Sequence, residues 1–242
     1  PYAVLITPLA FKSNVSHKKN EGDKPLVVFV HGFLHNKTCW ESLVKKLGYD
    51  TSGKDCPITK KDIYAINLGE PLTIEEIDHY ARYLATKLEQ IRIKRGLETL
   101  DVVMDCHSMG GLVAARFLTY APMVGVNVVR LIANGTPWHG TPLAHIATVA
   151  TCGREMTPDH DFQKELVENV NAIGERVFTI ASKGDTVVPY HSALGVGLDI
   201  PEDHRFTLDM PFGHLAMLHS PQAQTENVRL IEEGIALCGE KA

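Results

Sequence analysis

LDVVMDCHSMGGLVAARF, residues 100–117, is the segment that decides the fold of this chain. The part up to Cys106 is a short apolar run that is typical of a buried strand, and a helical run begins directly after it. Between the two, Ser108 occupies a tight strand-to-helix turn that lifts its hydroxyl above the edge of the sheet. Such a turn needs small residues on either side. Gly110 meets this need, and Cys106, which replaces the first glycine of the G-x-S-x-G pattern, is small enough for the turn to form.

Apolar strands alternate with amphipathic helices along the chain, which predicts a mostly parallel sheet with helices on both faces. Strands are expected at residues 26–30, 62–66, 100–106, 126–133, 176–181 and 205–208. Helices are expected at residues 38–47, 109–120, 162–170 and 222–238, with an irregular polar run at residues 152–161. A further long helix is expected to open with Thr73 and Glu76 at capping-box spacing and to end at Gly96. Residues 12–24 are the one evident polar loop, and residues 1–242 are predicted to form a single domain.

The composition limits the classes of function. The chain has 242 residues, 44% of them hydrophobic and 22% charged, so it can bury a large core without disulfides or metals. A net charge of -5 offers no basic field for phosphate backbones, so no nucleic-acid partner is expected. The five cysteines are odd in number and never form C-x-x-C. This favours free thiols in a reducing compartment such as the cytoplasm, with one disulfide and secretion left open. No apolar run approaches the roughly 18 residues of a membrane span.

A serine hydroxyl is a weak nucleophile until a base removes its proton, so an acid and a histidine are expected later in the chain. Asp185 follows the strand at residues 176–181 in a glycine-containing turn, where a carboxylate can reach a histidine across the sheet edge. Asp199 and Asp209 are the alternatives, and they are less well placed. The competing interpretation of Asp185 is a turn aspartate that hydrogen-bonds its own backbone.

His214 is the favoured base. It lies between the last strand and the terminal helix, and the preceding Gly213 lets the loop turn inward. His219, five residues further on, is its rival. His107, directly before Ser108, is expected to pack under the turn with its ring directed away from the hydroxyl.

A developing oxyanion needs two amide donors. Gly32, after the first strand, lets the chain turn so that the N–H of Phe33 points into the same space as that of Met109. The N-terminus of the following helix adds its positive dipole there. A plain strand-ending turn is the competing interpretation.

Together these motifs resemble the α/β-hydrolase lipases, particularly the small bacterial lipases and esterases with little or no lid. The likeness is carried by VHGF (residues 30–33), HSMGG (107–111), NGTPWHGTPL (134–143), GDTVV (184–188) and GHL (213–215). The resemblance implies the α/β-hydrolase fold with a minimal cap. It also implies a catalytic triad of Ser108, His214 and Asp185, an oxyanion hole made by the amides of Phe33 and Met109, and no cofactor. No convincing metal-ligand cluster is evident in the sequence.

The predicted activity is serine carboxylic-ester hydrolysis through an acyl-enzyme, acting on short-to-medium acyl esters or lipid esters. A small flap within residues 134–175 would leave the acyl site open at its mouth. The candidate apolar lining comprises Phe33, Leu34, Trp138, Val187 and Leu215. A thioesterase or acyltransferase with the same triad is the alternative, because the same nucleophile serves both. A non-catalytic binding protein is disfavoured, since all triad positions carry competent residues. The expected partner is a small acyl ester or a lipid, with transient contact to a lipid surface.

Overall fold

The computed structural model of the chain describes residues 24–51, 58–69, 74–158 and 160–239. These residues form a six-stranded sheet in the order β2-β1-β3-β4-β5-β6, and every neighbouring pair is parallel. The strands are β1 (Leu26–Val30), β2 (Ile63–Ala65), β3 (Leu100–His107), β4 (Val126–Asn134), β5 (Val177–Ala181) and β6 (Arg205–Thr207). The predicted α/β class and the predicted strands are confirmed.

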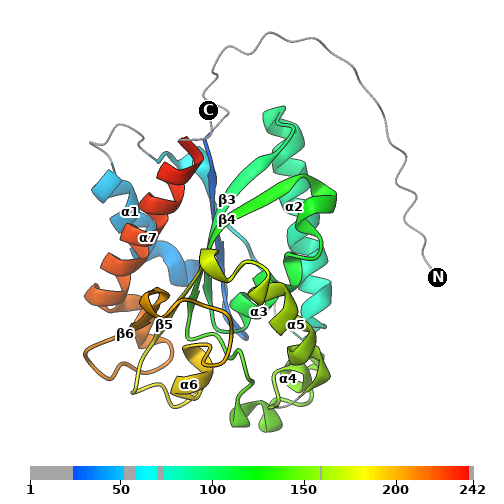
Figure 1. The fold of residues 1–242 in the computed structure, drawn as a ribbon, viewed down its shortest axis with the longest axis vertical. Coiled ribbons are helices and arrows are strands. Elements are labelled where there is room, and N and C mark those ends of the chain that lie inside the picture. The colour runs from blue at the N-terminus through cyan, green and yellow to red at the C-terminus, as the bar shows by residue number, and fades with distance from the viewer. Residues whose placement is uncertain (1–23, 52–57, 70–73, 159, 240–242) are drawn as a thin grey trace, which may run out of the picture.

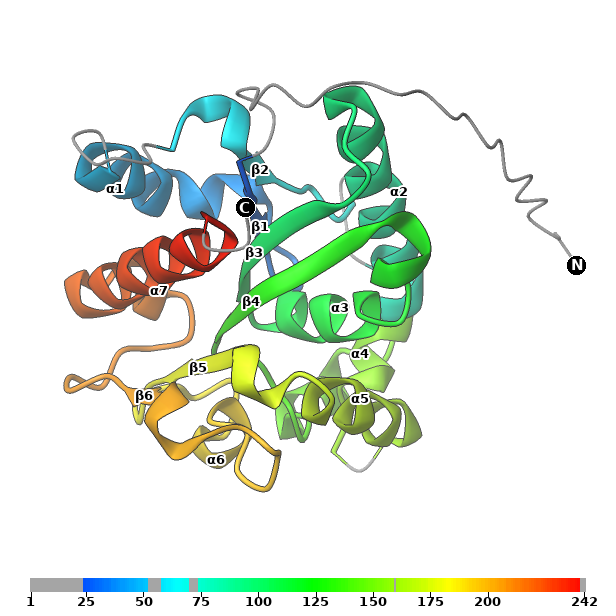
Figure 2. The same ribbon diagram turned by 45° about the horizontal axis from the view of Figure 1, so that its top comes forward.

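Helices cover both faces of the sheet, with α1 and α7 on one face and α2, α3 and α5 on the other (Figures 1 and 2). The larger helices are α1 (Glu41–Thr51), α2 (Ile77–Arg95), α3 (Met109–Phe117), α5 (Asp161–Asn171) and α7 (Pro221–Gly239). The short ones are α4 (Thr151–Glu155), α6 (Tyr190–Ala193), η2 (Lys37–Trp40), η3 (Lys60–Asp62), η4 (Ala121–Val124), η5 (Pro142–Ile146), η6 (Gly174–Arg176), η7 (Glu202–His204) and η8 (Ala216–His219). Within the described ranges, none of the helices combines the length and the apolarity that crossing a membrane requires.

The two faces of β1 show why the sheet is buried on both sides. All five residues of this strand are buried. Val27 and Phe29 pack in the cluster covered by α1 and α7, while Val28 and Val30 pack in the cluster covered by α2 and α3. A strand with apolar residues at every position, rather than at alternate positions, suits such a two-sided environment.

The parallel arrangement places the carboxyl ends of the strands along one edge. Val30 is paired with Cys106, and His107 is paired with Asn134. The loops that leave β1, β3 and β4 therefore start side by side. This edge is where ligands bind in open α/β sheets.

The predicted start of the long helix is wrong. The helix α2 begins at Ile77, with Glu76 as its N-cap residue and no capping hydrogen bond from that side chain. The carboxylate of Glu155, from α4, instead accepts a hydrogen bond of 2.7 Å from the Ile77 amide. A carboxylate distant in sequence thus satisfies a helix amide that has no partner inside its own helix. Thr73 lies outside the described residues, and the predicted end at Gly96 is confirmed by its left-handed backbone, with φ 69°.

The run at residues 152–161, expected to be irregular, begins inside the short helix α4. The polar loop expected at residues 12–24 lies outside the described residues except for its last position. The predicted helix at residues 162–170 is confirmed as α5.

Candidate active site

The predicted strand-to-helix turn at Ser108 is present. Ser108 has φ 54° and ψ −128°, a conformation that a residue with a side chain rarely adopts. A Cβ atom on Gly110 would lie 2.4 Å from the carbonyl oxygen of Val30, so only glycine lets α3 approach β1 this closely. Cys106 is fully buried and is accommodated at the position of the missing glycine.

Asp185 and His214 form a buried hydrogen-bonded pair. The Oδ2 atom of Asp185 lies 2.7 Å from Nδ1 of His214, and the aspartate side chain is fully buried. Because a carboxylate only accepts, Nδ1 donates, which leaves Nε2 of a neutral imidazole as a proton acceptor. The other oxygen, Oδ1, accepts hydrogen bonds from the amides of Val187 at 2.8 Å and Val188 at 2.9 Å. One oxygen of Asp185 therefore bonds to a histidine, and the other bonds to the backbone of its own turn.

The turn after β4 links this pair to the serine. The Ser108 amide donates to the carbonyl of Asn134 over 2.9 Å. The next residue, Gly135, has φ 57°, and a Cβ atom on it would lie 3.3 Å from Cε1 of His214 and 3.4 Å from Oδ2 of Asp185. The Ser108 amide and the Asp185–His214 pair thus lie against two adjacent backbone residues, Asn134 and Gly135.

The loop after β1 passes directly over the serine. A Cβ atom on Gly32 would lie 2.8 Å from Cβ of Ser108, so the chain can run here only as glycine. Phe33 follows at once, and Leu34 has φ 52°. Met109 is the first residue of α3, where an amide has no partner inside its own helix. The two predicted donor amides therefore belong to segments that flank Ser108.

The other candidates lie differently. His219 is exposed at the end of η8, and Asp209 is exposed and bonded to Gln222. His107 is fully buried, and its Nε2 lies 3.0 Å from the carbonyl oxygen of His214. The sequence predicted that His107 packs under the turn, but it did not predict this contact with His214.

Asp105 is a second buried acid, two residues before His107 on β3. Its Oδ1 accepts a hydrogen bond of 2.7 Å from the side-chain amide of Asn134. Burial raises the pKa of Asp105 well above its ordinary value, and it does the same to the thiol of Cys106. Burial therefore favours the neutral, protonated form of both groups.

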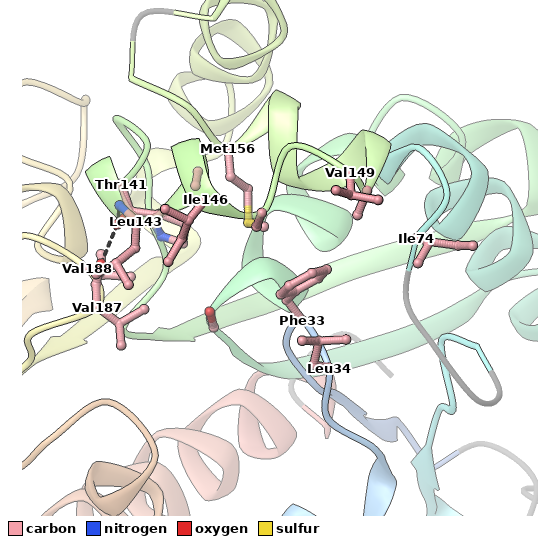
Figure 3. A pocket seen from close by; sticks show the side chains of 15 residues that line it. Phe33, Leu34, Ile74, Thr141, Leu143, Ile146, Val149, Met156, Val187 and Val188 are labelled. Carbon is pink, nitrogen blue, oxygen red and sulfur yellow. Dashed lines mark hydrogen bonds between the residues drawn. The ribbon is translucent and has the colours of Figure 1, made fainter.

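An apolar cavity of about 450 Å³ opens beside Ser108. Figure 3 shows Phe33 and Leu34 on one side of it and the segment that carries Ile146 and Met156 on the other. Val187 and Val188 line a further side. The Thr141 hydroxyl donates to the Val187 carbonyl and so fastens two of these segments together.

Two of the predicted lining residues do not line this cavity. Trp138 is buried in the core, where its ring packs near Gly195, and Leu215 is exposed outside the cavity. Phe33, Leu34 and Val187 do line it. Position along the chain correctly placed these loops near the serine, but it did not determine which way the Trp138 ring turns.

Residues 143–150 form a wall of the cavity that the sequence did not predict, here called the 143–150 wall. Leu143, Ile146 and Val149 are exposed along it, Ile146 by 80% and Val149 by 97%. Their spacing of three residues is the one feature of the sequence that could have indicated a shared apolar surface. In the part of the chain that the structure describes, no group of three or more His, Cys, Asp or Glu is arranged to hold a metal ion.

Comparison with known proteins supplies the family context. A family model described as PGAP1-like alpha/beta domain matches residues 21–185. No curated protein matches the chain. Among solved structures, lipase B of Aspergillus fumigatus superposes with a TM-score of 0.61 at 18% identity, over 86% of this chain and 52% of its own. The chain therefore spans about half the length of that lipase.

Two further structures match over most of both chains. Lipase BlEst2 of Bacillus licheniformis has a TM-score of 0.57 at 20% identity, over 90% of this chain and 96% of its own. The peroxisomal alpha-beta-hydrolase Lpx1 of Saccharomyces cerevisiae has a TM-score of 0.60 at 13% identity, over 91% and 80%. These likenesses, together with the sheet order, establish the α/β-hydrolase fold.

Proposed function

The chain belongs to the PGAP1-like alpha/beta domain family, and on that basis we propose that it is a serine carboxylic-ester hydrolase. Ser108 is the nucleophile, His214 the general base and Asp185 the acid that orients it. The family match includes Ser108 and Asp185 but ends before His214. The assignment of the base therefore rests on the structure of the site.

The observation that carries the proposal is the 2.7 Å hydrogen bond between Asp185 and His214 beside a serine on a strained turn. The contact between the Ser108 hydroxyl and Nε2 of His214 is inferred from two adjacent residues: Asn134 accepts a hydrogen bond from the Ser108 amide, and Gly135 lies against the His214 ring. A carboxylate that fixes one ring nitrogen leaves the other free to take a proton, which is how a histidine activates a serine.

The reaction follows from these positions. Nε2 of His214 takes the Ser108 proton as the serine oxygen attacks the ester carbonyl carbon, and the carbonyl oxygen becomes an oxyanion held by the Phe33 and Met109 amides. The C–O bond to the alcohol then breaks, and His214 returns the proton to the leaving oxygen. Water, deprotonated by His214, attacks the acyl-serine in the same way and releases the acid and the free enzyme.

The cavity indicates which part of the ester it receives. Aliphatic side chains and one methionine supply most of its lining, so it suits an acyl chain better than a charged alcohol group. Leu34, Ile146 and Val149 extend this apolar surface outward around the mouth. We therefore infer that short-to-medium acyl esters bind within the cavity and that lipid esters can be drawn from a lipid surface in transient contact with the rim.

Activity-based labelling tests the proposal. A fluorophosphonate probe should label the wild type and should not label Ser108→Ala. Ser42→Ala is the matched control, because Ser42 lies on α1 and its only described role is to accept a hydrogen bond from Gln224. Equal labelling of Ser108→Ala and the wild type would refute the assignment of the nucleophile.

A substrate series then defines the acyl group and the leaving group. p-Nitrophenyl esters from acetate to palmitate should show the best kcat/KM at short or medium length. Hydrolysis of acyl-CoA well above the rate for the oxygen ester of the same acyl chain would instead assign the chain as a thioesterase with the same triad.

A further inference from the structure

His107 is a buried, potentially ionisable group to which the proposed reaction gives no role. It is the last residue of β3 and directly precedes Ser108. Side chains alternate between the two faces of a strand, so His107 shares a face with Val103, four residues earlier. Val103 packs in the cluster covered by α1 and α7, and the loop that carries His214 leads into α7. The alternation of β3 therefore directs the His107 ring toward the loop of the base.

Two contacts join His107 to His214. Nε2 of His107 lies 3.0 Å from the His214 carbonyl oxygen, and because a carbonyl only accepts, Nε2 carries the hydrogen and donates it. The two imidazole rings also lie against one another, with centroids 4.7 Å apart and planes inclined by 42°. One side chain thus restrains both the main chain and the ring of His214.

The opposite edge of the same ring faces the loop after β1. A Cβ atom on Gly32 would lie 3.3 Å from Nδ1 of His107 and 2.8 Å from Cβ of Ser108. Phe33, whose amide is the proposed second oxyanion donor, is the next residue. His107 therefore fills the space between the loop that supplies this donor and the loop that supplies the base.

We propose that His107 is a positioning residue that holds the His214 imidazole in the orientation in which its Nε2 takes the proton of Ser108. This inference rests on the proposed ester hydrolysis, since it concerns the proton transfer of that reaction. Burial, with a further contribution from the nearby His214, lowers the pKa of His107 well below its ordinary value. The His107 ring therefore stays neutral, and it adds no second positive charge beside His214 when His214 becomes cationic.

Two substitutions separate positioning from packing. His107→Leu removes the donor and the ring, whereas His107→Gln keeps an N–H donor at similar reach. For p-nitrophenyl butyrate, kcat of His107→Leu should fall by about 10- to 100-fold while KM changes by less than about twofold, because misplacement of a reacting group by 1 Å costs this much. His107→Gln should recover most of the loss, and the rate of fluorophosphonate labelling of Ser108 should follow kcat. His79→Leu, at an exposed site on α2, is the control and should match the wild type.

The outcomes are distinguishable. A wild type that neither labels nor hydrolyses any ester refutes the proposed function, and the positioning role with it. If the wild type is active, three results would refute the positioning role alone. These are full kcat in His107→Leu, a kcat of His107→Gln no higher than that of His107→Leu, and a change in KM in place of the fall in kcat.

A measurement on the wild type alone covers the case in which His107→Leu does not fold. Imidazole 15N–1H spectra at neutral pH should show His107 as a neutral ring with its hydrogen on Nε2. A His107 ring that carries its hydrogen on Nδ1 at this pH overturns the proposal.

Discussion

The two sides of the cavity beside Ser108 are built in different ways. On the side of Asp185 and His214, both carboxylate oxygens accept hydrogen bonds and the carboxylate is fully buried. On the other side, the 143–150 wall presents Ile146 and Val149 to solvent, exposed by 80% and 97%. The proposed chemistry thus depends on directional, buried contacts that tolerate little change. The contacts with the acyl chain are apolar and non-directional, so substrate preference can change without disturbing the chemistry.

The largest effect should come from removing the buried carboxylate of Asp185. Asp185→Asn should lower kcat for p-nitrophenyl butyrate by about 10³- to 10⁴-fold, because an amide in place of the carboxylate no longer fixes the tautomer of His214. Asp209→Asn is the matched control: it makes the same change at an exposed aspartate and should retain wild-type kcat. A loss smaller than tenfold for Asp185→Asn would remove Asp185 from the triad.

The next effect tests whether the strained turn needs its glycine. A Cβ atom on Gly110 would lie 2.4 Å from the backbone of Val30, so Gly110→Ala should lower the free energy of unfolding by about 1–3 kcal/mol and slow the labelling of Ser108. Gly48→Ala, in α1, meets nothing within 4 Å and should stabilise the protein by about 0.5–1 kcal/mol. Urea unfolding measures both changes, and a shift of the same sign in the two variants would contradict the packing at Gly110.

A smaller effect on the buried side depends on pH. The folded state lowers the pKa of His107, so below the ordinary value of 6.5 the unfolded state binds a proton that the folded state does not. Stability from this residue is therefore present above pH 6.5 and is lost as pH falls through that value toward the lower, folded-state pKa. From pH 7 to pH 5 the wild type should lose up to about 2 kcal/mol more stability than His107→Gln. Urea unfolding at both pH values checks this. Equal losses of stability in the two proteins would show that His107 takes up its proton in the folded state as readily as in the unfolded state. His31 and His35, whose pKa values burial also lowers, are present in both proteins, so their own titration contributes to both losses.

The same contrast explains what the sequence could predict. The strands, the turn at Ser108 and the partners Asp185 and His214 are encoded in short segments with fixed local geometry. Periodicity identified the strands. Asp185 and His214 were favoured over the other aspartates and histidines because each follows a glycine in a loop near the end of a strand. Because parallel strands bring their carboxyl ends to one edge, the convergence of these distant residues followed from the topology.

What the sequence could not predict depends on packing between distant segments. The start of α2 is set by Glu155, 78 residues beyond Ile77 along the chain. The ring of Trp138 could turn toward the cavity or toward the core, and in the structure it packs in the core near Gly195. The 143–150 wall shows only apolar residues three positions apart, and its role comes from lying opposite Phe33 (Figure 3).

The weakest effect should come from changes in the 143–150 wall. The double variant Ile146→Ser/Val149→Ser should change the free energy of unfolding by less than about 0.5 kcal/mol, because both side chains are already exposed. Its kcat/KM should match the wild type for p-nitrophenyl acetate and should fall by about three- to tenfold for the longest ester that the wild type accepts, since only a long chain buries surface on these residues.

Met123→Ser is the control for this pair. Met123 is 67% exposed in η4, at the opposite edge of the sheet. Met123→Ser should therefore leave kcat/KM unchanged for esters of every length. If the wall contacts only the acyl chain, the loss of kcat/KM in the double variant should grow with the length of that chain. If the double variant lost the same factor with acetate as with the longest ester, the wall would be acting on the reacting groups themselves. The two sides of the cavity would then be coupled, and a change of acyl preference could not leave the chemistry untouched.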